Sequence, residues 1–218
     1  MRLNKYVAHA SDMSRRSADE AITGGRVSVN GQNAVIGQRI KPDDLVALDG
    51  RPLRPSPQLY VAINKPQGYV CSRRGQSSPT IYELLPEKYH SLKSVGRLDK
   101  DSSGLILLTN DGDFSNLMTH PKFAKTKIYE VTTDKPLSPD HRKQIESGVT
   151  LADGASRLHV TRQTGKQLVI NLSEGRNRQI RRTLAALGYG VKRLHRSQFG
   201  PYRLNGLQSG QYKEVQKL

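Results

Sequence analysis

Six runs of apolar and β-branched residues, separated by turn-forming residues, dominate the sequence from residue 59 onward. The runs are Leu59–Asn64, Gly104–Thr109, Lys127–Thr133, Arg157–Thr161, Gln167–Asn171 and Val191–Arg196. Their length and residue types are typical of strands. In this part of the chain, helical periodicity is confined to three segments, Asp113–His120, Pro139–Ser147 and Asn177–Leu187. Because strands and helices do not alternate strictly, the pattern predicts a mainly antiparallel, mixed α+β domain instead of a doubly wound parallel sheet.

The first fifty residues follow a different pattern. Leu3, Val7 and Ala10 recur at helical spacing, and Ser14 is a suitable N-cap for a second helix over Arg15–Thr23. After a glycine pair come three strand-like segments with two hairpin-type turns, Asn30-Gly31 and Asp49-Gly50. The strand-like segments are Val27–Val29, Ala34–Val35 and Val46–Leu48. This part of the sequence therefore predicts a small helix–helix–sheet module.

A proline-rich segment separates the two patterns. Arg51–Pro57 is poor in apolar residues and stiffened by its prolines, as in an interdomain linker. The chain of 218 residues is long enough for one ordinary domain and a small module. We therefore expect an N-terminal module over residues 1–56 and a larger domain over residues 59–218.

Charge narrows the class of partner. The chain has 35 Lys and Arg against 19 Asp and Glu, a formal charge of +16, which favours a polyanion such as nucleic acid. Cys71 is the one cysteine and the six histidines are scattered, so neither an intramolecular disulfide nor a zinc site is expected. The apolar runs stay far below the roughly 18 residues of a membrane span, and the N-terminus has no signal-peptide core. We expect a cytoplasmic protein without a bound metal.

The basic residues of the N-terminal module occur where a phosphate could use them. Arg15 and Arg16 lie in the opening turn of the second predicted helix, where the helix dipole disfavours cations by some tenths of a kcal/mol. A phosphate backbone would compensate, and Arg2 and Lys5 could join the same face. The alternative is an ordinary solvated helix end.

Three stretches of this module resemble a known RNA-binding unit. Arg2–Ala8, Ser14–Arg16 and Gly25–Gly31 are similar to the module named after ribosomal protein S-four. The resemblance implies that the module binds RNA, with Arg2, Lys5, Arg15 and Arg16 as its contact residues.

Asp99 occupies the most distinctive segment, Gly96–Leu105. This carboxylate lies between Arg97 and Lys100, just before a glycine-bounded apolar strand, and the adjacent cations favour its ionised form. An ionised carboxylate in such a position can act as a nucleophile or as an electrostatic stabiliser. By spacing alone, an aspartate that caps a loop turn is the more ordinary interpretation.

The amino-acid sequence of this segment is similar to the signature of RNA pseudouridine synthases. The resemblance implies that Asp99 is the catalytic nucleophile and that Arg97 helps to flip the target base. A second segment, Glu174–Arg182, resembles the family's Gly-Arg-x-x-Gln-Ile-Arg element, which makes Arg181 the partner of Asp99 and lets Arg176, Arg178 and Arg182 face RNA. In the third element, Lys125–Val131, the resemblance assigns Tyr129 to stacking on the uracil.

Further matches extend the resemblance over nearly the whole chain. Asn64–Val70 and Gly188–Arg196 resemble scaffold elements of the branch that modifies ribosomal RNA. There are two departures: Ser102 stands where the family usually has threonine, and Gly210–Val215 lacks the arginine of the family's terminal element. The family resemblance implies an isomerisation of uridine to pseudouridine that needs no cofactor.

Two other classes of protein fit part of the sequence. A non-catalytic RNA-binding or ribosome-assembly protein would use the same basic residues but would leave the setting of Asp99 unexplained. An RNA methyltransferase would need a glycine-rich nucleotide loop, and neither G-x-G-x-x-G nor a Walker-type loop is present. For the target we expect 23S rRNA before 16S rRNA, because Glu174–Arg182 looks like the large-subunit enzymes, although Asn64–Ser72 looks like the small-subunit one. We expect a monomer acting on a ribosomal subunit or an assembly intermediate.

Overall fold

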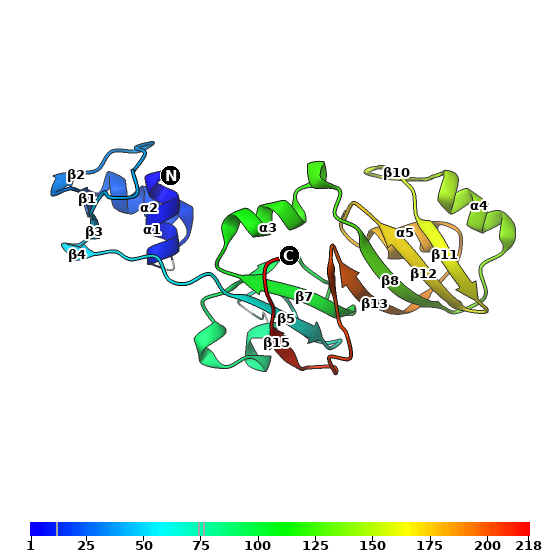
Figure 1. Ribbon diagram of the computed structural model, residues 1–218. Helices are drawn as coiled ribbons and strands as arrows, with labels where there is room; N and C mark the ends of the chain where they lie inside the picture. Colours follow the sequence, from blue (N-terminus) through cyan, green and yellow to red (C-terminus); the bar gives the residue numbers. More distant parts are fainter. Residues whose placement is uncertain (12, 74, 76) are drawn as a thin grey trace. The chain divides into compact units, whose positions relative to one another are not determined.

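The computed structural model describes residues 1–11, 13–73, 75 and 77–218 (Figure 1). Within these ranges the chain divides into two compact units, Met1–Gln58 and Leu59–Leu218. The predicted break between the first two helices falls in part on Asp12, which lies outside the described residues. No helix in the described ranges is both long and apolar enough to cross a lipid bilayer.

The first unit contains two helices and a small antiparallel sheet. Ser14 caps the second helix as predicted, because its Oγ accepts a hydrogen bond of 3.0 Å from the backbone N–H of Ser17. The elements are α1 (Leu3–Ala10), α2 (Arg15–Thr23), β1 (Val27–Val29), β2 (Gln32–Asn33), β3 (Val46–Leu48) and β4 (Arg51–Pro52), and the sheet order is β2-β1-β3-β4. Apolar side chains of both helices, Leu3, Val7 and Ile22 among them, are buried against β1 and β3.

Two details of this unit differ from the expectation. The strand predicted at Ala34–Val35 lies at Gln32–Asn33, because positive φ angles at both Asn30 and Gly31 make a two-residue turn that pairs Val29 directly with Gln32. The segment predicted as a linker begins with β4, in which Arg51 pairs with Leu48 after a similar turn. Pro52 is tolerated there because β4 is an edge strand.

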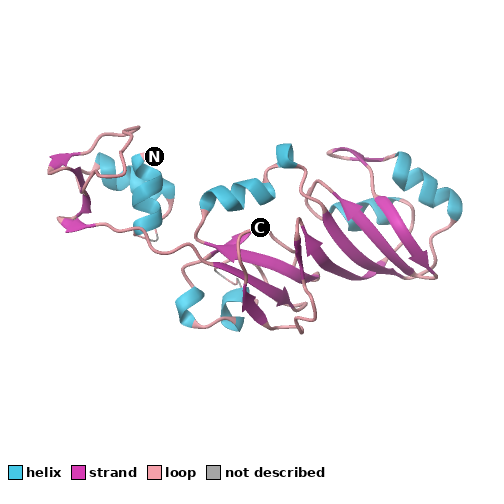
Figure 2. Ribbon diagram, in the orientation of Figure 1, coloured by secondary structure: helices cyan, strands magenta, loops and turns pink. Residues whose placement is uncertain are grey.

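The second unit is built on a nine-stranded sheet. Figure 2 shows its longer strands side by side. The central path runs β11-β12-β8-β13-β7-β5-β15, with β14 paired to β13 and β6 to β7. Of the pairings described in this sheet, β13 with β7 is parallel and the others are antiparallel. The strands of the unit, with the separate β9–β10 hairpin, are β5 (Tyr60–Lys65), β6 (Lys93–Val95), β7 (Ser103–Thr109), β8 (Lys127–Thr133), β9 (Val149–Leu151), β10 (Gly154–Ser156), β11 (His159–Thr164), β12 (Gln167–Leu172), β13 (Val191–Phe199), β14 (Tyr202–Arg203) and β15 (Tyr212–Glu214). The predicted mainly antiparallel α+β fold is confirmed.

Short helices flank this sheet. They are α3 (Gly112–Thr119), α4 (Pro139–Ser147), α5 (Gln179–Ala186), and the 3-10 turns η1 (Ile81–Leu84), η2 (Glu87–Tyr89) and η3 (Pro121–Phe123). In Figures 1 and 2, α3 lies beside β7 and α4 beside β11. The helix predicted from Asn177 begins later, at Gln179, because Arg178 adopts a left-handed backbone with φ 46°.

The parallel contact between β7 and β13 requires a glycine. At Gly104, φ is +111°, and a Cβ there would lie 2.3 Å from the carbonyl oxygen of Arg196. The two backbones can meet this closely only because Gly104 has no side chain. This junction fixes the loop that ends at β7 next to β13, and both contribute to the site described below.

Candidate active site

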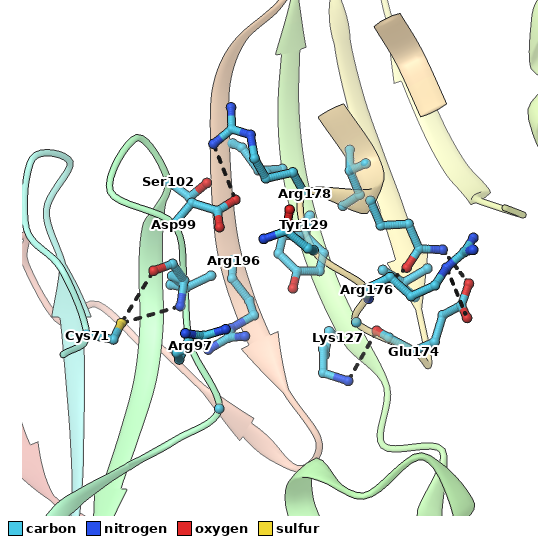
Figure 3. Close-up of a pocket in the computed structure, with 18 of the residues that line it drawn as sticks. Cys71, Arg97, Asp99, Ser102, Lys127, Tyr129, Glu174, Arg176, Arg178 and Arg196 are labelled. Atoms are coloured by element: carbon cyan, nitrogen blue, oxygen red, sulfur yellow. Dashed lines mark hydrogen bonds and ion pairs between the residues drawn. The ribbon is translucent and has the colours of Figure 1, made fainter. Parts of the chain in front are cut away.

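A cavity of about 680 Å³ opens over β8 and β13 of the second unit (Figure 3). Its walls come from the loop before β7, from β8, from the segment between β12 and α5, and from β13. Five of the residues singled out in the sequence line it: Arg97, Asp99, Tyr129, Arg176 and Arg178. Segments far apart in the chain therefore meet here.

Asp99 lies in the loop that leads into β7. Its backbone carbonyl accepts a hydrogen bond of 3.1 Å from the N–H of Ser102, which closes a turn just before the strand. Its carboxylate is about one-third exposed, and Oδ2 lies 3.7 Å from Nη1 of Arg178 (Figure 3). The carboxylate thus faces the cavity with a guanidinium beside it.

Arg178 and Asp101 form the closest ion pair at this edge of the cavity. Nη1 and Nη2 of Arg178 each donate a 2.9 Å hydrogen bond to one carboxylate oxygen of Asp101. The hydrogen bond from Arg178 lowers the pKa of Asp101. Burial opposes this shift, and the charge of Arg181 adds to it. Asp101 therefore stays ionised and holds the Arg178 side chain next to Asp99.

The structure places Arg181 against Asp101 and not against Asp99, its expected partner. Arg181 donates 2.9 Å from Nη2 to the carbonyl oxygen of Asp101 and 3.0 Å from Nη1 to that of Val191, and its Nε lies 3.3 Å from Asp101 Oδ2. The physical reason is that α5 starts later than predicted. Arg178 therefore lies before the helix and reaches Asp99, whereas Arg181 lies in the first turn of the helix and binds the backbone of Asp101 and Val191.

Tyr129 lies on β8, in the central part of the sheet. Its neighbours in the register are Ile170 on β12 and Arg196 on β13, and its side chain is 8% exposed while still lining the cavity. The ring is thus held by strands on both sides and offers an apolar surface to the cavity (Figure 3). Arg97, on the opposite loop, is exposed and also lines the cavity.

Arg176 and Arg182 bind the β9–β10 hairpin. Arg182 makes two hydrogen bonds of 2.8 and 2.9 Å to the carboxylate of Asp153, and Arg176 Nη1 lies 3.2 Å from the same carboxylate. Arg176 also donates to the carbonyl oxygens of Gly154 and Ala155. Both guanidinium groups therefore attach the hairpin to the segment before α5, and they share the single charge of Asp153. That they also face RNA stays a prediction.

Lys65 and Arg196 are buried cations in two segments that the family resemblance assigns to the scaffold. Lys65, 0% exposed at the end of β5, donates to the carbonyl oxygens of Pro66 and Tyr69, and burial lowers its pKa to about 8 although the charges of Cys71, Asp101 and Asp99 oppose this. Arg196 on β13 is 2% exposed and lines the cavity. For Lys65 the signal is a basic residue at the end of a run of buried strand residues, whereas β13 alternates between exposed and buried positions and gives no such signal for Arg196.

The basic residues of the first unit lie on its two helices. Arg15 and Arg16 are exposed in the first turn of α2, Arg2 is the exposed N-cap residue of α1, and Lys5 is half-buried on α1. Arg15 donates a 3.3 Å hydrogen bond to the side chain of Asn4, which brings the two helix starts together. In the described part of the chain, no group of three His, Cys, Asp or Glu side chains is arranged to hold a metal ion.

The chain is similar to several known proteins. A family model described as RNA pseudouridylate synthase matches residues 59–186. An RNA pseudouridine synthase of Aquifex aeolicus is 34% identical over 99% of this chain and 90% of its own length. The ribosomal small subunit pseudouridine synthase A of Salmonella typhimurium is 38% identical over 99% of this chain and 96% of its own, and the dual-specificity RNA pseudouridine synthase RluF of Escherichia coli is 35% identical over 99% and 75%.

A solved structure shares the fold over the full length. The crystal structure of a pseudouridylate synthase superimposes with a TM-score of 0.71 at 32% identity, covering 99% of this chain and 96% of that one. A family model over more than half of the chain, relatives of this identity and a matching structure all point the same way. The chain belongs to the RNA pseudouridylate synthase family, whose members are isomerases.

Proposed function

We propose that this chain converts a uridine of ribosomal RNA to pseudouridine, with the carboxylate of Asp99 as the nucleophile and without a cofactor. The observation that carries the proposal is the position of Asp99 at the cavity, 3.7 Å from the guanidinium of Arg178 and in the same cavity as the ring of Tyr129. A negative oxygen, a fixed cation and an aromatic surface are the groups that this reaction uses.

The reaction exchanges one glycosidic bond for another. The bond from ribose C1′ to ring N1 breaks, the bond from C1′ to ring C5 forms, and the C5 proton is lost while N1 gains one, so that the atoms balance without hydrolysis or redox change. An ionised carboxylate can attack the sugar or assist formation of a glycal-like intermediate. The cavity would hold the detached uracil and exclude water from the sugar.

The target uridine must leave its stack before it can enter the cavity. Unstacking costs a few kcal/mol, which stacking of the uracil on Tyr129 and insertion of Arg97 into the vacated position would offset. The buried, strand-held ring of Tyr129 and the exposed side chain of Arg97 support these roles. The first unit would bind neighbouring RNA through Arg2, Lys5, Arg15 and Arg16.

Two ribosomal RNAs are candidate substrates. The Glu174–Arg182 segment favours 23S rRNA. The 38% identity to a ribosomal small subunit pseudouridine synthase favours 16S rRNA instead, and the relative named as dual-specificity is 35% identical. Both RNAs are therefore included in the test.

Chemical mapping of pseudouridine in 16S and 23S rRNA tests the proposal. The RNA is taken from cells that lack the protein and from the same cells complemented with the wild type or Asp99→Asn. The expected result is one uridine that loses its modification and regains it with the wild type alone. If no site changes, or if Asp99→Asn restores the site fully, a non-catalytic RNA-binding role replaces the proposal.

A further inference from the structure

Arg196 is a buried cation whose hydrogen-bonding capacity is only partly used. Its Nε donates a 2.8 Å hydrogen bond to the carbonyl oxygen of Leu105, and its guanidinium carbon lies 4.8 Å from the centre of the Phe199 ring. Nη2 is buried and has no hydrogen-bond partner in the part of the chain that the structure describes. A buried donor without a partner is costly, so a group that completes its hydrogen bonds on binding gains that free energy.

The backbone keeps Arg196 in place. The residue pairs with Gly104 on β7 and with Tyr129 on β8, and the missing Cβ of Gly104 lets the two strands approach. Its side chain therefore emerges from the middle of the sheet at the floor of the cavity. Such a rigid placement is suited to binding and unsuited to a role as a solvated surface charge.

Lys127 stands on the neighbouring strand and faces the same ring. It pairs with Phe199 in the register, and its Nζ lies 5.3 Å from the centre of that ring. Its hydrogen bonds to the carbonyl oxygens of Glu174 and Lys125 are long, 3.3 and 3.4 Å. Burial, followed by the charge of Arg196, lowers the pKa of Lys127, with Glu174 opposing. The two cations are thus near enough to repel each other.

The carboxylates of the cavity are engaged elsewhere. Among the described residues that line it, the acidic ones are Asp99 and Glu174, and the cationic ones are Arg97, Lys100, Lys127, Arg176, Arg178 and Arg196. Asp99 lies beside Arg178, and the Glu174 side chain accepts from Gln179 and lies 3.8 Å from Arg176. In Figure 3, Lys127 lies at the lower end of the cavity and Asp99 with Arg178 at the upper end.

We propose that Lys127 and Arg196 form a subsite for a phosphate group of the RNA backbone next to the target nucleotide. The inference rests on the proposed action on RNA and deepens it. Two adjacent cations favour a full negative charge over a uracil carbonyl oxygen, and a guanidinium with a free edge together with an ammonium suits a phosphate. A free phosphate ion shares this chemistry and is distinguished in the experiment.

Binding of small uridine ligands tests the subsite without the need for a mapped RNA target. Uridine, uridine 3′,5′-bisphosphate and inorganic phosphate are titrated separately into the full chain at fixed ionic strength, with dissociation constants measured by NMR or calorimetry. The bisphosphate should bind the wild type at least about tenfold more tightly than uridine, because one charge-assisted hydrogen bond contributes about that factor to the affinity. Lys127→Met should bring the two affinities to within about threefold, and Lys127→Arg should restore most of the difference.

Three controls separate the possible outcomes. Lys143→Met removes an exposed cation of α4 outside the cavity and should leave the difference unchanged. Arg196→Lys keeps the charge at the buried position but loses the fork, and a partial loss is expected, with circular dichroism to verify folding. Asp99→Asn should keep the preference for the bisphosphate over uridine, because Lys127 and Arg196 are still present. If Asp99→Asn proves active on RNA, the proposed nucleophile fails while the subsite result stands.

Three results would overturn the subsite. The first is equal binding of uridine and its bisphosphate, or no binding of the bisphosphate, by the wild type. The second is an equal loss for both ligands in Lys127→Met. The third is binding of inorganic phosphate as tight as that of the bisphosphate, which would make this a site for a free anion.

Discussion

Arg178 joins the loop before β7 to the start of α5 through a two-point ion pair with Asp101, both N–O distances being 2.9 Å. The same guanidinium lies 3.7 Å from Asp99. Arg178 achieves this from a left-handed backbone conformation, φ 46°, which is strained for a residue with a side chain. The strain and the ion pair together place a cation beside the proposed nucleophile.

Loss of this cation should reduce the rate of reaction. We predict that Arg178→Gln lowers kcat on ribosomal RNA by about 10²-fold with a smaller change in KM, because the cation acts on the reacting carboxylate more than on RNA binding. Arg181→Gln is the matched comparison three residues later, in the first turn of α5, and should cost less, since Arg181 binds the backbone carbonyls of Asp101 and Val191. A larger loss of kcat in Arg181→Gln than in Arg178→Gln, in steady-state kinetics, would contradict this assignment.

The ring of Tyr129 should matter more than its hydroxyl. Tyr129→Phe keeps the aromatic surface, and we expect its kcat/KM to stay within about threefold of the wild type. Tyr129→Leu removes the surface on which the uracil would stack and should lose about 10-fold to 10²-fold. The two variants are compared under single turnover, with thermal unfolding measured in parallel. Equal activity of the leucine and phenylalanine variants would rule out a stacking role.

The junction of β7 and β13 should be intolerant of any side chain. We predict that Gly104→Ala lowers the free energy of unfolding by about 3 kcal/mol, because its Cβ would lie 2.3 Å from Arg196 O on a backbone of φ +111°. Gly165→Ala is the control: its φ is +55°, but no atom lies within 4 Å of the added Cβ, so it should cost only about 1 kcal/mol. Urea unfolding measures both, and similar losses would show that the close strand contact is unimportant.

Asp111 should make the protein sensitive to acid. Burial raises the pKa of this carboxyl, but hydrogen bonds from Lys217, the Phe114 N–H and Tyr60 outweigh it and bring the pKa to about 2, below the usual 3.8. A lowered folded-state pKa contributes stability that is fully present above about pH 4 and is lost as the pH falls toward 2. Asp111→Asn should therefore be about 2 kcal/mol less stable than the wild type at pH 7. A gap between the two that stays constant from pH 6 to pH 2.5 in urea unfolding would contradict the prediction.

Local signals in the sequence predicted most of the secondary structure. Ser14 and the helical spacing of Leu3 and Val7 defined the first two helices, because capping and amphipathicity depend on residues only a few positions apart. The long apolar runs form strands whose ends differ from the predicted ones by at most three residues. The short strands β6, β9, β10, β14 and β15 were missed, since two or three residues carry too little periodicity.

The site was harder to derive, because its contacts join residues distant in the chain. Only the family resemblance predicted that distant residues form one site. Five of these residues line the cavity: Arg97, Asp99, Tyr129, Arg176 and Arg178. The resemblance assigned the partner of Asp99 to Arg181, since a string of arginines does not reveal that α5 starts two residues late. The pairing of Asp153 with Arg182, 29 positions apart, depends on tertiary structure in the same way.

The role of Asp99 is tested most directly by single-turnover conversion of ribosomal RNA taken from cells that lack the protein. Purified wild type, Asp99→Asn and Asp101→Asn are compared, because the two substitutions remove the same charge two positions apart on one loop. Asp99→Asn should lose at least about a thousandfold in rate while still binding the RNA, and Asp101→Asn should lose roughly tenfold. Retention of wild-type rate by Asp99→Asn, or an equal loss in both variants, would contradict the assignment of Asp99 as the nucleophile.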